Sequence, residues 1–345
     1  MRRSFIVLLA TLTLLLSACS SQETTPDKIV LMTHESFAVS DGVLEQFTEE
    51  TGVTVEVIRS ADAGTMVNQA ILVKDNPVAD VLYGIDNTFL SRALNEGIFV
   101  AHRAEGIDKV PASLRDPDDR VTPIDFGDVC LNTDLAGLEQ LGLEPPTDLR
   151  DLVGPAFRGL LVVEDPTTSS PGLSFLLATI ETFGESGDYP WQAFWRDLVA
   201  NDVRIVPGWD QAYYGEFSGG SGEGDRPIVV SYASSPVAEV YFGDLDEAPT
   251  GVPESGCFRQ IEYAGVLSGT EAEESAGRLV DFLLGETFQE DLPLNMFVFP
   301  ANSEAELPPV FVDHAVIPAA PIVMDPARID ENRERWLSEW ASAVR

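Results

Sequence analysis

Apolar and polar positions along the first hundred residues follow two alternating patterns. Short apolar runs rich in β-branched residues predict strands, and the longer segments between them carry apolar residues at helical spacing. The predicted strands are 28–33, 54–59 and 79–83, and the predicted helices are 42–51, 65–73 and 87–96. Asn87 is placed to cap the last helix, and Gly52 and Gly97 follow the first and last. This order predicts a mostly parallel sheet with helices on both faces.

The same pattern returns in the second half of the chain. Predicted strands are 160–163, 203–206 and 228–231, and predicted helices are 173–183, 191–200, 210–217 and about 329–344. In the last helix Trp336 and Trp340 lie four residues apart, so they share a face and are expected to be packing residues. Two α/β units in 345 residues predict two lobes.

The chain begins with an apolar run, residues 5–16, that follows Arg2 and Arg3. The run is too short to span a membrane and reads as the apolar part of a secretory signal. Leu16-Ser17-Ala18-Cys19 resembles the bacterial lipobox, in which the cysteine is acylated after cleavage. We therefore expect a signal peptide at 1–18, a lipid on Cys19, a tether at 19–27, and a mature protein anchored to the cell membrane outside the cytoplasm.

Charge and motif content narrow the possible functions. Without residues 1–18 the chain has 19 basic and 57 acidic residues, a net charge of −38, which repels nucleic acid and anionic lipid. It has no Gly-x-Ser-x-Gly, His-Glu-x-x-His or P-loop motif, so we predict a binding protein rather than an enzyme. His34, His102 and His314 are scattered without metal-ligand spacing, and no metal or cofactor is expected.

Two cysteines remain in the predicted mature chain, Cys130 and Cys257, both in strand-like contexts. An even pair in an oxidising compartment predicts a disulfide. Closing so long a loop would stabilise the fold by ~4–5 kcal/mol on the chain-entropy model. Two buried free thiols are the alternative.

Residues suited to ligand contact follow the ends of several predicted strands. In open α/β sheets ligands bind at the carboxyl ends of strands, and Ser170 is expected to cap a helix there with Pro171 in its first position. Ordinary turn and capping chemistry explains each residue equally well when it is taken singly. Together they predict an aromatic and acidic cleft suited to a flat, positively charged ring. The candidates are His34, Asp86, Ser169, Ser170, Trp209, Tyr213 and Tyr232.

Several stretches, in this order and spacing, resemble the periplasmic thiamine-binding proteins of bacterial thiamine ABC importers. They are Thr33–Ala38, Ala79–Asn87, Asp125–Gly127, Asp165–Leu173, Gly208–Tyr213, Val230–Pro236 and Trp336–Trp340. The resemblance implies a two-lobed class II solute-binding fold with a hinge of two chain crossovers. It implies lobe 1 at 28–124 plus about 262–318, and lobe 2 at 125–261 plus about 319–345.

The resemblance also implies binding residues. Ser169, Trp209 and Tyr232 match the family's binding positions, and Asp62 and Gly64 lie near the loop that holds a phosphate end. Phe297 stands where the family has a tryptophan, and His34 where it has a tyrosine, which brings a titratable group into the cleft. Asp128 adds an acid near the hinge, where an aromatic residue is expected.

The implied function is capture of thiamine, or one of its phosphate esters, by a monomer that delivers it to an ABC permease. A ferric-iron binder of the same fold is an alternative, since Tyr213 and Tyr214 are adjacent. A polyamine binder also fits an acidic aromatic cleft. A surface lipoprotein hydrolase is a third, more distant alternative.

Overall fold

The computed structural model describes residues 28–220 and 222–345. The predicted signal peptide, Cys19 and the tether lie outside these residues. Within the described ranges, none of the helices combines the length and the apolar character that a membrane crossing requires.

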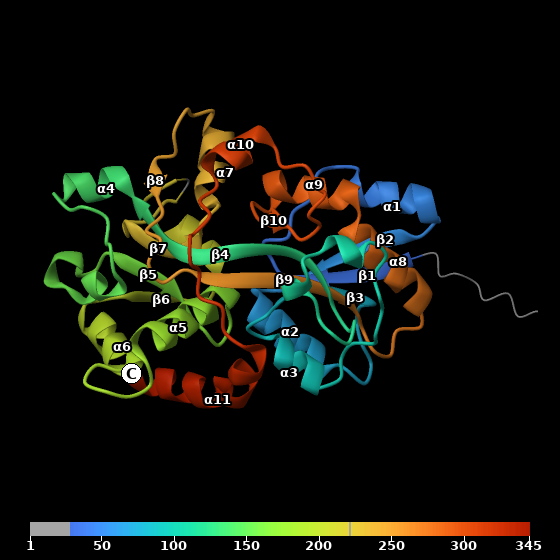
Figure 1. The fold of residues 1–345 in the computed structure, drawn as a ribbon, viewed down its shortest axis with the longest axis horizontal. Helices are drawn as coiled ribbons and strands as arrows, with labels where there is room; N and C mark the ends of the chain where they lie inside the picture. Colours follow the sequence, from blue (N-terminus) through green and yellow to red (C-terminus); the bar gives the residue numbers. More distant parts are fainter. Residues whose placement is uncertain (1–27, 221) are drawn as a thin grey trace, which may run out of the picture.

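One mixed sheet runs through the whole molecule, in the order β2-β1-β3-β9-β4-β7-β5-β6 (Figure 1). Its two ends are parallel trios, β2-β1-β3 and β7-β5-β6, and each trio forms the centre of one lobe. The short strands β8 and β10 both pair with β4. The strands are β1 Lys28–Thr33, β2 Thr54–Arg59, β3 Val81–Asp86, β4 Thr122–Asp134, β5 Leu161–Glu164, β6 Arg204–Val206, β7 Ile228–Tyr232, β8 Thr250–Gly251, β9 Phe258–Val266 and β10 Phe299–Pro300.

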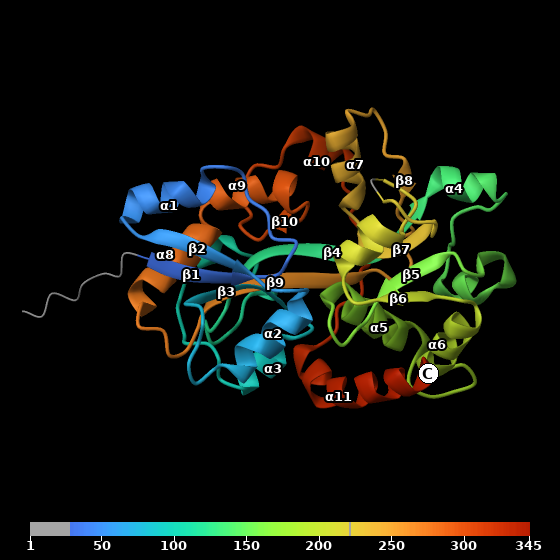
Figure 2. The same ribbon diagram turned by 180° about the vertical axis from the view of Figure 1, so that it is seen from behind.

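Helices cover both faces of the sheet, which gives the α/β fold that the sequence predicts (Figures 1 and 2). The α-helices are α1 Val43–Thr51, α2 Ala63–Leu72, α3 Leu90–Asn95, α4 Leu135–Gln140, α5 Ser170–Phe183, α6 Trp191–Ala200, α7 Ser235–Gly243, α8 Glu273–Leu284, α9 Glu286–Asn295, α10 Pro309–His314 and α11 Pro326–Ala343. Single 3-10 turns are Ile107–Lys109, Ala112–Leu114, Leu149–Val153 and Pro155–Phe157, and η5, Gln211–Glu216, is a π-helical turn. Helices α1, α7, α9 and α10 lie on one face, and α2, α3, α5, α6 and α11 on the other.

Three predicted elements have the observed bounds, namely β1, β2 and α6. The predicted cap Asn87 is wrong: it exchanges hydrogen bonds with Ile261 on β9, so α3 begins only at Leu90. The predicted cap Ser170 is also one residue late. The carbonyl of Ser169 already accepts from the Leu173 amide, so Ser170 is the first helical residue.

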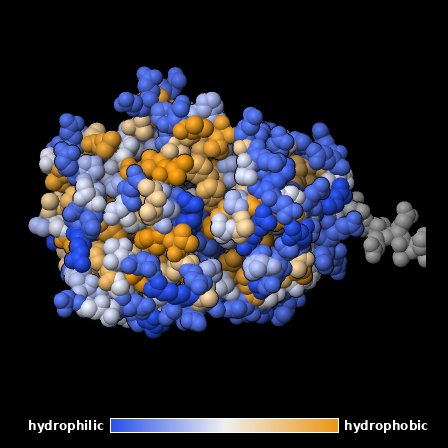
Figure 3. Space-filling model, in the orientation of Figure 1, coloured by the Kyte–Doolittle hydropathy of each residue, from blue (hydrophilic) through white to orange (hydrophobic). Residues whose placement is uncertain are grey.

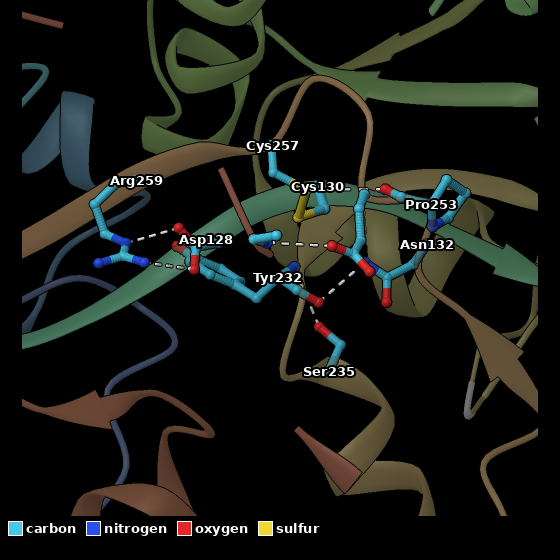
Figure 4. Close-up of a disulfide and its surroundings, with 10 residues drawn as sticks. Asp128, Cys130, Asn132, Tyr232, Ser235, Pro253, Cys257 and Arg259 are labelled. Carbon is cyan, nitrogen blue, oxygen red and sulfur yellow. Dashed lines mark hydrogen bonds and ion pairs between the residues drawn. A yellow bond between two sulfur atoms is a disulfide. The ribbon is translucent and has the colours of Figure 1, made fainter. Parts of the chain in front are cut away.

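Two long antiparallel strands, β4 and β9, lie between the parallel trios. β4 pairs with β9 over its first part and with β7 over its second, so it passes from one lobe to the other. The predicted disulfide is present: Cys130 on β4 bonds Cys257, just before β9, over a sequence separation of 127 (Figure 4). Beside it, Arg259 on β9 donates to both carboxylate oxygens of Asp128 on β4, at 2.7 and 3.0 Å. Covalent and ionic links thus join the crossing strands.

The C-terminal helix α11 packs against α3 of one lobe and α6 of the other. Its Trp336 and Trp340 are buried, as predicted, and Trp340 meets Trp195 of α6 edge to face at 5.7 Å. Trp191, Trp195, Trp336 and Trp340 form what we name the tryptophan core. Its members are at most 4% exposed.

Candidate functional site

A cleft of about 390 Å³ opens between the lobes. Residues that follow β1, β6 and β7 meet there, as the rule for strand ends predicts. Seven of the predicted residues line it, namely His34, Asp62, Ser170, Trp209, Tyr213, Tyr232 and Phe297. Gly64, Asp86 and Ser169 are not among the lining residues.

Asp62 joins the two sides of the cleft. It caps α2 by accepting from the Ala63 amide at 2.7 Å. Across the cleft its carboxylate also accepts from the amides of Ser170 and Trp209, at 3.3 and 3.0 Å. Burial raises the pKa of Asp62, and these donated hydrogen bonds oppose that shift. The side chain therefore fixes the start of α2 against the opposite lobe.

One side of the cleft is what we name the aromatic wall, made of Trp209, Tyr213, Tyr214 and Tyr232. Trp209 stacks on Tyr213 with ring centres 5.0 Å apart, and its indole N–H donates to Ser231 Oγ at 2.9 Å. The Tyr213 hydroxyl is turned to Glu239, at 2.6 Å, so this ring supports Trp209 from behind. Hydrogen bonds from the polar atoms of Trp209 and Tyr213 thus hold the wall in place, and Trp209 is half-buried.

Tyr232 lies close against the crossing strand β4. A Cβ at Gly127 would come within 3.0 Å of the Tyr232 ring, so glycine permits this approach. The Tyr232 hydroxyl donates to Gln260 Oε1 at 3.0 Å, which links the wall to β9. The ring is therefore held at the junction of the two lobes.

The rim of the cleft contains an aromatic residue, Phe242, that the sequence analysis did not predict, beside the predicted Phe297. Phe242 of α7 is 75% exposed, lines the cleft and meets Phe297 at 5.6 Å between ring centres. Phe297 has φ 53°, uncommon for a residue with a side chain, and Ser234 Oγ donates to its carbonyl. Figure 3 shows an apolar patch near α7 and α10, one of several on this face of the molecule. In the sequence, the only indication of this role is that Phe242 is an aromatic residue near the end of a helix.

The cleft is also acidic. Glu35 and Asp62 lie opposite the aromatic wall, Asp210 follows Trp209 on the same side as the wall, and Glu262 comes from β9. None of the lining residues in the described chain is Lys or Arg. Burial and the nearby Asp210 raise the pKa of Glu35. Of these carboxylates only Asp62 was predicted. Glu262 lies within β9 and not at a strand end. The expectation that ligands bind at the carboxyl ends of strands therefore does not identify it.

The three predicted residues outside the lining serve the local structure. Asp86 accepts hydrogen bonds from Thr88 and Phe89 in the turn after β3, and burial raises its pKa to about 6. Gly64 packs directly against Phe89 and the Thr168 carbonyl, where a Cβ would clash. Ser169 is fully buried behind the cleft at the start of α5. Their direct contact with a ligand stays a prediction.

Among the described residues, no cluster of three or more His, Cys, Asp or Glu side chains is arranged to hold a metal ion. Tyr213 and Tyr214, the pair that suggested iron, meet edge to face, and the Tyr213 hydroxyl donates a hydrogen bond to Glu239. The arrangement is suited to holding an organic ring.

Comparisons with known proteins agree with this geometry. Residues 76–332 match the family model described as bacterial extracellular solute-binding protein. The thiamine-binding periplasmic protein of Brucella abortus is 28% identical over 326 residues, 92% of each chain. A solved periplasmic thiamin binding protein superposes with a TM-score of 0.81 at 25% identity, covering 92% of this chain and 96% of that one. Iron-bound HitA from Pseudomonas aeruginosa, at 18% identity and a TM-score of 0.71 over 92% and 99% of the two chains, shares the fold.

Proposed function

Because the chain belongs to the bacterial extracellular solute-binding protein family, we propose that it captures thiamine, or a thiamine phosphate, outside the cytoplasm. Members of this family bind their solutes without converting them, so no catalytic step is assigned. The ligand is bound between the lobes and then passed to the permease of an ABC importer. The iron alternative has weaker support, since an iron uptake protein of Synechocystis is 25% identical over 83% of this chain and the iron-bound HitA shares only the fold.

The observation that carries this proposal is the pairing of an aromatic wall with an acidic side in one cleft. Thiamine has two flat rings, one of them permanently positively charged. Stacking and cation–π contact with Trp209 and Tyr232 would each contribute ~0.5–2 kcal/mol in a desolvated site. The facing carboxylates would attract the charge, and the thiamine-binding relatives support this choice of ligand.

Capture requires the lobes to move. We assign the hinge to β4 and β9, close to the predicted lobe boundaries at about 125 and 262. Opening would break the hydrogen bonds from Ser170 and Trp209 to Asp62, and that from Ser36 to Asp210 at 2.7 Å. A ligand that contacts both sides adds interactions that exist only when the lobes are closed. Its binding therefore favours the closed state.

Delivery to a permease requires the protein to stay beside the membrane. The lipid predicted on Cys19 would provide this anchor. Labelling cells with a fatty-acid analogue should mark the wild-type protein and leave Cys19→Ser unmarked. Equal labelling of both forms would contradict the anchor, while the binding function would be unaffected.

The decisive test is calorimetric titration of thiamine into protein lacking residues 1–19. We expect saturable one-to-one binding at nanomolar to low micromolar concentration. Thiamine monophosphate, spermidine and ferric citrate are titrated in parallel. Absence of thiamine binding together with binding of spermidine or iron would overturn the proposal.

A further inference from the structure

Glu262 lines the cleft, and only one of its two carboxylate oxygens accepts a hydrogen bond from the described residues. Its Oε1 accepts from the amide nitrogen of Gln260 at 3.1 Å. The orientation of that amide is fixed, because the Tyr232 hydroxyl donates to its oxygen. Glu262 is only 7% exposed, yet its Oε2 is buried without a hydrogen-bond partner among the described residues. A buried acceptor left open in a binding cleft indicates a partner supplied by the ligand.

His34 is the protein group nearest to that open oxygen. Its Nε2 lies 3.6 Å from Glu262 Oε2, too far for a good hydrogen bond but close enough for an ion pair. The Nε2 atom, like Oε2, has no hydrogen-bond partner in the described part of the chain. Gly84, at φ +97°, makes room for the imidazole, since a Cβ there would come within 2.3 Å of His34 Cδ2. The ring is therefore placed by packing, beside a carboxylate that it only partly engages.

The groups that face His34 are almost all acids. They are Glu262 from β9, Asp62 from the start of α2, Asp125 from β4, Tyr83 from β3, and the adjacent Glu35. Burial lowers the pKa of the His34 imidazole, but the carboxylates, Glu262 first, outweigh it and raise the pKa above its ordinary value. His34 therefore changes charge at a higher pH than an ordinary histidine side chain does.

We propose that Glu262 Oε2 balances the positive charge of the ligand, and that protonated His34 competes with the ligand for this same oxygen. The inference rests on the proposed function, in which the ligand is the thiamine cation. Two positive charges beside one carboxylate repel each other, so a bound cation favours neutral His34. Capture then strengthens as pH rises through the pKa of His34 and weakens as pH falls below it. Each capture event at lower pH releases a proton from His34.

Calorimetry in two buffers of different ionisation enthalpy measures this release directly. We titrate thiamine at pH 6, 7 and 8.5 into the wild type, His34→Gln, Glu262→Gln and His102→Gln. His102→Gln is the matched control, since His102 also pairs with a carboxylate, Asp281 at 2.8 Å, but lies outside the cleft. The pKa values of the cleft carboxylates Glu35 and Asp62 are also raised, so the comparison of the wild type with His34→Gln isolates the contribution of His34.

The wild type and His102→Gln should bind about tenfold more weakly at pH 6 than at pH 8.5, with proton release approaching one per thiamine at the lower pH. His34→Gln should bind with nearly constant affinity and release no proton. Glu262→Gln should bind at least about tenfold more weakly at pH 8.5.

Three results would overturn the inference. The first is wild-type binding of thiamine without proton release or pH dependence, which leaves the proposed function standing. The second is an unchanged pH profile in His34→Gln, and the third is full affinity in Glu262→Gln. Failure of the wild type to bind thiamine at any of the three pH values would overturn the proposed function as well.

Discussion

The aromatic wall and the tryptophan core are built from the same kinds of side chain and differ in what covers them. In the core, Trp336 is fully buried, and the contact of Trp340 with Trp195 joins α11 to α6. In the wall, Trp209 is half-buried, its N–H is bonded to Ser231, and the ring lines the cleft. An aromatic residue whose polar atom is satisfied while a face stays open is suited to a ligand. The core residues have no such face.

The largest effect should come from the core. Trp336→Ala removes a fully buried indole and should lower the free energy of unfolding by ~3–5 kcal/mol. Because Trp336 does not line the cleft, the variant should keep wild-type thiamine affinity at temperatures where it is folded. Denaturant unfolding and calorimetry measure the two quantities. A large loss of affinity in folded protein would break the distinction between core and wall.

The disulfide beneath the wall gives the next largest effect. Cys130 pairs with Ser231 in the register of β4 and β7, immediately next to the wall. Cys130→Ser should reduce stability by ~2–4 kcal/mol under oxidising conditions and leave affinity nearly unchanged. A reductant should lower the wild-type melting temperature in the same direction. If reduction leaves that temperature unchanged, the bridge contributes nothing to stability.

Substitutions in the aromatic wall should lower the affinity for thiamine. Trp209→Ala and Tyr232→Ala should each weaken thiamine binding at least tenfold, which corresponds to ~1.4 kcal/mol or more. Stability should change little, because Trp209 already exposes part of its surface. Calorimetric titration beside thermal melting tests both statements. Wild-type affinity in both variants would remove the wall from the binding site.

The smallest effect separates the ring of Tyr232 from its hydroxyl. Tyr232→Phe keeps the stacking surface and removes only the hydrogen bond to Gln260. Because this bond joins two protein groups, its loss should lower the free energy of unfolding by ~0.5–1.5 kcal/mol and leave thiamine affinity nearly unchanged, as calorimetry and denaturant unfolding would show. A loss of affinity as large as that of Tyr232→Ala would show that the hydroxyl, rather than the ring, carries the ligand contact.

Local patterns predict the fold well where pairing is local. β1, β2 and α6 follow from apolar periodicity, and their bounds agree with the sequence to the residue. Pairing across the chain is where the reasoning failed. Asn87 has the side chain of a helix cap, but its hydrogen bonds go to β9, a strand 170 or more residues away. No nearby residue signals such a partner.

The same limit applies to the cleft. His34, Trp209 and Tyr232 could be placed there because each follows a predicted strand. Glu262 lies within an antiparallel strand, and its position in the cleft depends on the order of strands in the sheet. Phe242 depends on how α7 packs beside Phe297. The places of both residues in the cleft follow only from the assembled structure of the two lobes.

The distribution of tryptophan has a practical consequence. Four of the five indoles lie in the tryptophan core, shielded from solvent, and Trp209 alone lines the cleft. A change in indole emission on ligand addition would therefore come from one residue, with the other four as a steady background. The fluorescence of Trp209 therefore reports how much of the protein has bound ligand. Trp209→Phe, which lacks this signal, is the control.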